Sequence, residues 1–142
     1  MRPTTSRSRS LTMSLAIALA LLSPLAVSAQ SDLDASQAEA FLGEWVIDMD
    51  TDFGAFSMNL DVTDEGGKVA ANIGSPDLGG MQSVSDISRE GESLVMVWEM
   101  DAQGQFVNAM MSLELEGEDL IATFDIADGQ FIAEGVGTKA GS

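Results

Sequence analysis

Hydrophobic residues recur at every second position through most of the chain beyond residue 43. The alternation begins with Trp45, Ile47 and Met49, and Asp48 and Asp50 lie between and after them. Side chains of a β-strand point alternately to its two faces, so a period of two predicts strands with one buried face. Seven further stretches show the same period: residues 56–62, 69–73, 82–88, 94–100, 107–113, 120–126 and 131–136.

Short turn signals separate these eight stretches and leave no room for a long crossover. They are rich in Gly, Asp and Glu, as in Asp64–Gly67 and Asp101–Gly104. Eight antiparallel strands in sequence order most simply close into an up-and-down barrel, which removes exposed edges. We therefore expect an all-β, eight-stranded barrel over residues 43–139 and a short tail at 140–142. A two-sheet sandwich is the alternative. In the last strand, Ile132 and Val136 compete with Phe131 and Ala133 for the inner face.

The chain begins with the pattern of an export signal. Arg2, Arg7 and Arg9 precede an apolar run over Leu11–Leu22, and small residues end at Ala29. The run is too short to span a membrane comfortably, since a spanning helix needs roughly 20 apolar residues. We expect a signal peptide over residues 1–29, cleaved in a bacterial periplasmic or secreted protein. No cysteine follows the run, which argues against a lipid anchor.

A short lead-in at residues 30–42 connects the signal to the barrel. Its alanines and Glu39 are good helix formers, and Asp34 or Ser36 could cap a helix. The pattern predicts a short N-terminal helix over Asp32–Leu42.

The charge beyond Ala29 is strongly negative. All 23 acidic residues lie there, against the three basic residues Lys68, Arg89 and Lys139, so the net charge is −20. Such a surface repels nucleic acid and anionic membranes, and we expect neither as a partner. It suits a salty exterior, where counterions screen self-repulsion, so we expect a halophilic or marine source. The chain has no cysteine, so a disulfide scaffold is excluded.

The stretch "FLGEW" at residues 41–45 resembles the entrance motif of the calycin superfamily, which includes lipocalins, fatty-acid-binding proteins and avidins. The resemblance implies that Trp45 closes one barrel end and that Lys139 packs across its ring. The hairpins at residues 66–76 and 89–100 resemble those of a group of small exported bacterial barrels. Fatty-acid-binding proteins have a helical lid and an inward arginine–tyrosine group, and this chain has neither pattern.

Residue types used in catalysis are scarce. The chain contains no histidine, the commonest general base, and no cysteine nucleophile. It has no nucleophile-elbow motif, and the acidic residues fall mainly at outward or turn positions. A hydrolase that works through two carboxylates is the remaining catalytic interpretation. We expect a protein that is not an enzyme and needs no cofactor.

The inner face is rich in methionine, which fills irregular space and suits a promiscuous apolar pocket. Eight-stranded barrels either fill with side chains or hold one small ligand. We expect a carrier for a small apolar molecule; the alternative is a structural or protein-interaction module of the cell envelope with a filled core. The oligomeric state is left open. The candidate ligand-binding residues are Met49, Phe56, Met58, Met96, Trp98, Met111 and Phe124.

The stretch "DMDTDFG" resembles the opening of a calcium loop, because Asp48, Asp50 and Asp52 alternate before Gly54. An EF-hand requires glycine at position 6, glutamate at position 12 and flanking helices, and this stretch has none of them. We therefore expect no EF-hand and at most a weak surface cation site formed by the three aspartates. The better interpretation is an acidic hairpin tip at the barrel end opposite Trp45.

Overall fold

A computed structural model describes residues 31–76 and 79–141; the expected signal peptide lies outside this range. The described chain is all-β apart from two 3-10 turns, η1 (Ala35–Gln37) and η2 (Glu39–Phe41). Its strands are β1 (Gly43–Thr51), β2 (Gly54–Glu65), β3 (Lys68–Ser75), β4 (Gly80–Val84), β5 (Asp86–Glu90), β6 (Ser93–Ala102), β7 (Gln105–Glu116), β8 (Asp119–Ile126) and β9 (Phe131–Lys139).

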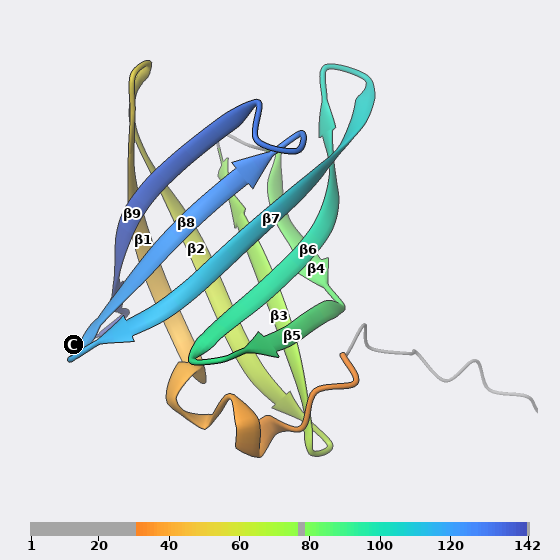
Figure 1. The fold of residues 1–142 in the computed structure, drawn as a ribbon, viewed down its shortest axis with the longest axis vertical. Coiled ribbons are helices and arrows are strands. Elements are labelled where there is room, and N and C mark those ends of the chain that lie inside the picture. Colours follow the sequence, from red (N-terminus) through yellow and green to blue (C-terminus); the bar gives the residue numbers. More distant parts are fainter. Residues whose placement is uncertain (1–30, 77–78, 142) are drawn as a thin grey trace, which may run out of the picture.

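All nine strands belong to one antiparallel up-and-down sheet. Neighbours in the sheet follow the order β4-β3-β2-β1-β9-β8-β7-β6-β5, so the first strand, β1, pairs with the last, β9. The sheet curls into a barrel (Figure 1). Its two edge strands, β4 and β5, are consecutive in the chain. The expected up-and-down arrangement is therefore present.

The expected count of eight strands is wrong, because the stretch 82–88 divides at Ser85. The first half, β4, pairs with β3, and the second half, β5, pairs with β6. One segment is thus shared between the two neighbours instead of pairing with both along its whole length. Strands twist and coil as a barrel closes, so one strand need not follow both of its neighbours along its whole length.

The expected helix over Asp32–Leu42 is also wrong. The backbone amides of Ser31 and Ala35 donate to Val69 and Gly67 of the β2–β3 hairpin, at 2.8 and 2.9 Å. These bonds hold the lead-in along the start of β3, which has no strand neighbour on this side because β5 pairs with β6. Asp34 makes no capping hydrogen bond; its carboxylate pairs with Lys68 instead. Tertiary pairing therefore replaces the local helix.

The interior is continuous and apolar. The last strand follows the phase that buries Ala133 and partly buries Phe131, while Ile132 and Val136 face outward. Gly135 and Gly137 lie where a side chain would collide with the core: a Cβ on Gly135 would contact the Asp48 carbonyl oxygen and Met49 Sδ. Among the described residues, no helix is long and apolar enough to cross a membrane.

Candidate functional site

The seven candidate ligand-binding residues share the interior of the barrel. Phe56 is half-buried against the core, and the other six are buried. Trp98 and Phe124 stack with ring centroids 5.7 Å apart and an interplanar angle of 8°. Arg89 lies in β5, and Gly91 and Glu92 form the turn that follows.

A small hollow lies in the interior beside the gap between β4 and β6. Its volume is about 20 Å³, and Met58, Trp98 and Phe124 of the candidate set line it. A cavity needs about 10–15 Å³ to hold one water, so this space is far below that of a small-molecule pocket. The Gln82 side chain spans the gap, where its Nε2 donates to the Glu99 carbonyl oxygen at 2.5 Å. The barrel is therefore filled by its own side chains.

The lower end in Figure 1 carries the 3-10 turns and the residues of the "FLGEW" stretch. Trp45 is buried, and its Nε1 donates to the Phe41 carbonyl oxygen at 2.8 Å. Lys139 Nζ lies 5.3 Å from the centroid of the Trp45 ring. Arg89 forms a second contact of this kind, 5.1 Å from the centroid of Phe41. No sequence signal predicts the Arg89–Phe41 pair, because its members are far apart in the chain and belong to no recognisable motif.

All three basic residues of the described chain lie at this end. Besides the two ring contacts, Lys68 forms an ion pair with Asp34 at 2.6 Å and donates to the Asp32 carbonyl oxygen at 3.0 Å. Each of these cations therefore contacts either the lead-in or Trp45. The opposite end of the barrel has acidic side chains without a described cation beside them.

That opposite end carries the β1–β2, β6–β7 and β8–β9 turns (Figure 1). Asp52 and Phe53 form the tip of the β1–β2 hairpin, and Asp48 and Asp50 are exposed on the outer face of β1. The described residues contain no group of three or more His, Cys, Asp or Glu that could hold a metal ion, and the weak cation site at the three aspartates stays a prediction.

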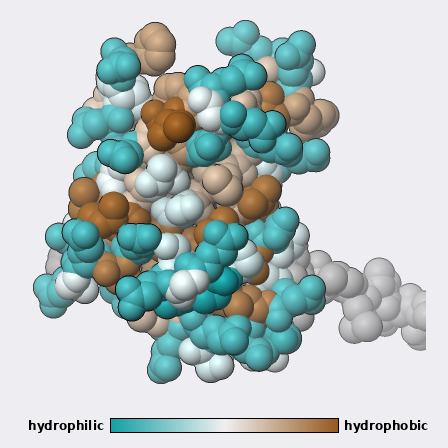
Figure 2. Space-filling model, viewed as in Figure 1, coloured by the Kyte–Doolittle hydropathy of each residue, from teal (hydrophilic) through white to brown (hydrophobic). Residues whose placement is uncertain are grey.

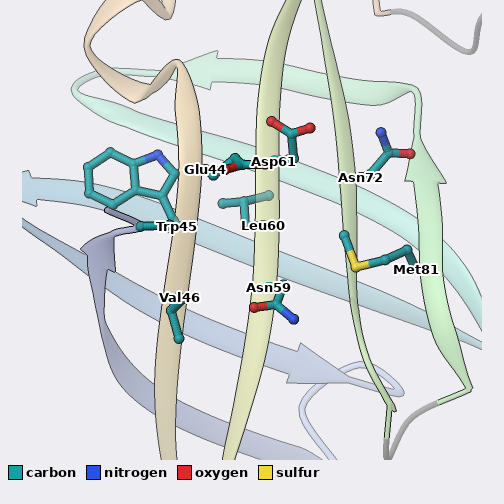
Figure 3. A pocket seen from close by; sticks show the side chains of 9 residues that line it. Glu44, Trp45, Val46, Asn59, Leu60, Asp61, Asn72 and Met81 are labelled. Carbon is teal, nitrogen blue, oxygen red and sulfur yellow. The ribbon is translucent and has the colours of Figure 1, made fainter. Parts of the chain in front are cut away.

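The larger hollows lie on the outer wall. One, of about 420 Å³, runs over β1, β2 and β3, where Glu44, Asp61 and Asn72 surround it with Met81 of β4 on one side (Figure 3). Its walls mix carboxylate and amide groups with aliphatic side chains.

A second outer hollow, of about 910 Å³, lies over β1, β9 and β8. Figure 2 shows hydrophobic patches between hydrophilic side chains on the face that includes β8 and β9. The sequence signal for this surface is in the last strand, where two sets of alternating apolar residues compete for the inner face. The set that faces outward contributes two large aliphatic side chains to the wall. We refer to this hollow as the β9 groove; its lining residues are Asp48, Asp50, Thr51, Asp52, Ile121, Ile132, Glu134, Gly135, Val136 and Thr138.

No protein-family model and no curated protein sequence matches the chain. Among solved structures, a mutant of the fluorescent protein UnaG is similar, with 19% identity and a TM-score of 0.49 over 74% of this chain and 99% of that one. A secretory abundant heat soluble protein from Ramazzottius varieornatus is similar at 13% identity and a TM-score of 0.41, over 71% and 96% of the two chains. At these values the function must be argued from this chain's own geometry.

Proposed function

We propose that this protein is an exported, non-catalytic interaction module that engages its partner through the outer wall of a filled barrel. The observation that supports the proposal is the contrast in free space: about 20 Å³ inside the barrel against hollows of about 420 and 910 Å³ outside it. Ligand pockets for small molecules usually measure about 300–1,000 Å³. Hollows of this size lie on the outer wall, where they are open to solvent.

The export signal and the acidic surface belong to the same proposal. A protein secreted into salty surroundings has its surface charge screened and remains soluble at high net charge. The non-catalytic part is supported by the composition, which contains neither histidine nor cysteine. The acidic residues that line the β9 groove are solvent-exposed, whereas a catalytic carboxylate pair is usually held in a cleft with distinct environments for its two members.

Carriage of a small apolar molecule inside the barrel is the second candidate. The gap between β4 and β6 favours it, because among the described residues only the Gln82 side chain bridges the two strands by a hydrogen bond. Met58 and Met100 lie behind the gap and could move, since methionine adapts readily to new packing. A ligand would have to displace these side chains from a core that is already packed.

Native mass spectrometry of the protein purified from its own host, combined with titration of the neutral dye Nile red, separates the two candidates. The interaction module predicts a mass without a bound small molecule and no enclosed dye. As a positive control, Phe124→Ala removes a buried ring and opens a cavity that suits benzene, so this variant should bind benzene, as followed by NMR shifts, if it remains folded by circular dichroism. Met58→Ala is the milder control. A co-purifying apolar molecule, or dye uptake by the unmodified protein, would contradict the interaction module and support the carrier.

A further inference from the structure

The geometry points to a cationic, amphipathic polypeptide segment as the partner of the β9 groove. We propose that a segment in which Lys or Arg residues alternate with apolar residues binds across β1, β9 and β8. This inference rests on the proposed function, which it deepens by naming the surface and the chemistry of the partner.

Acidic and apolar side chains alternate in rows across the groove. Asp50 of β1 is directly opposite Glu134 of β9. In the next row Asp48 is opposite Val136, which is in turn opposite Ile121 of β8. A binding segment therefore meets carboxylates and aliphatic side chains within one strand spacing of each other. Lys and Arg match this arrangement because their aliphatic stems cover apolar surface while their charged ends reach the carboxylates.

The apolar side chains of this wall are unusually exposed. Ile132 is 58% exposed and Val136 is 45% exposed. At the upper rim, Phe53 is 90% exposed and its ring lies 6.5 Å from that of Phe131. Large apolar side chains grouped on a surface mark interaction sites. A simple polyamine or metal ion would use the carboxylates but leave Ile132, Val136 and Phe53 in water.

The charge of the groove is not balanced within the described chain. Asp50, Asp52 and Glu134 have no hydrogen-bond or ion-pair partner among the described residues, and Asp48 accepts one hydrogen bond, from Ser57 at 2.6 Å. The described basic residues lie at the other end of the barrel. These uncompensated charges attract a cationic segment and repel an acidic one.

The test is a titration of the protein with a capped synthetic peptide, Lys-Val-Lys-Thr-Lys-Val, followed by NMR amide shifts and calorimetry at about 0.05 M salt, where charge screening is weak. We expect shifts confined to β1, β8 and β9. The variant Asp50→Asn/Glu134→Gln should weaken binding about five- to tenfold, as expected for the loss of two exposed ion pairs. Its matched control is Glu116→Gln/Asp119→Asn, which removes another directly opposed acidic pair at the far end of the barrel. The control should change the affinity less than about twofold.

The apolar contribution is tested by Val136→Thr, which keeps the side-chain shape and should weaken the peptide but leave spermine binding unchanged. Equal weakening by both acidic-pair variants would overturn the proposal, because binding would then follow net charge alone. So would spermine binding as tightly as the peptide with the same shifts, or the absence of shifts in the groove. These results would leave the interaction module intact, whereas an apolar molecule found inside the barrel would remove the proposed function itself.

Discussion

At the scale of single residues, Gly43 explains why a glycine precedes Glu44 and Trp45 at the barrel entrance. Gly43 has φ +125°, a conformation that residues with a side chain rarely adopt. A Cβ at this position would also lie 3.3 Å from Cε of Lys139, the residue whose ammonium group lies over Trp45. Glycine therefore supplies both the backbone conformation and the space for the lysine stem.

Replacing Gly43 with alanine should destabilise the protein more than the same change at Gly54. Gly54 has nearly the same φ, +127°, but a Cβ added there would meet no atom within 4 Å, so it is a matched control for backbone strain. Strain of this kind costs about 1–3 kcal/mol. We expect both variants to lose that amount and Gly43→Ala to lose about 1 kcal/mol more in urea unfolding, because Lys139 is displaced from Trp45.

The double variant Gly43→Ala/Lys139→Ala isolates the contact. If the lysine stem is the cause, Gly43→Ala should cost less in the Lys139→Ala background than in the unmodified protein. Equal costs in the two backgrounds, or equal losses for Gly43→Ala and Gly54→Ala, would show that the clash with Lys139 does not matter.

At the scale of elements, alternation predicts most of this sheet because hairpin strands pair with their sequence neighbours. The stretch Trp45–Met49 and its successors have one apolar face each, and the observed pairing follows chain order. The division at Ser85 could not be predicted, since it depends on which neighbour each half of the segment follows. The same holds for the lead-in, whose good helix formers are overruled by pairing with β3.

The interior illustrates a similar limit for the candidate site. The inward phase of the methionines was visible in the sequence, but the remaining free volume depends on how Trp98 and Phe124 pack across the barrel. Residues such as Gln82, which reaches Glu99 on a strand that does not pair with its own, carry no local pattern either.

The lead-in should open without unfolding the barrel when its cation is removed. Lys68→Met keeps most of the aliphatic stem but removes the 2.6 Å ion pair with Asp34. We expect hydrogen exchange at the Ser31 and Ala35 amides to accelerate severalfold, because local opening needs less free energy than global unfolding. Global stability should fall by less than about 1 kcal/mol, since the ion pair is partly exposed. Lys139→Met, with the same charge change elsewhere, should leave these two amides unchanged; slower or unaltered exchange in Lys68→Met would contradict the expectation.

At the scale of the whole molecule, the few positive charges of the described chain gather at one end of a barrel that is acidic throughout. The basic residues of the described chain lie at the lower end, whereas acidic residues lie at both ends and on the outer wall, where they repel one another. Opposed acidic pairs such as Asp50–Glu134 and Glu116–Asp119 are destabilising in the free protein at low salt. Counterions or a cationic partner reduce this repulsion, because both supply positive charge.

Salt should therefore stabilise the free protein. The Debye length falls from about 10 Å at 0.1 M to about 3 Å at 1 M, so repulsion across the surface is largely removed over that range. We expect the melting temperature to rise by about 5 °C or more between about 0.1 and 1 M sodium chloride, which corresponds to roughly 1 kcal/mol for a domain of this size. The variant Glu116→Gln/Asp119→Asn begins with less repulsion and should show a higher melting temperature at low salt and a smaller rise. If the variant and the unmodified protein respond to salt with the same slope, sodium chloride acts through the solvent and not through these charges. The expectation of a salt-adapted surface would then be wrong.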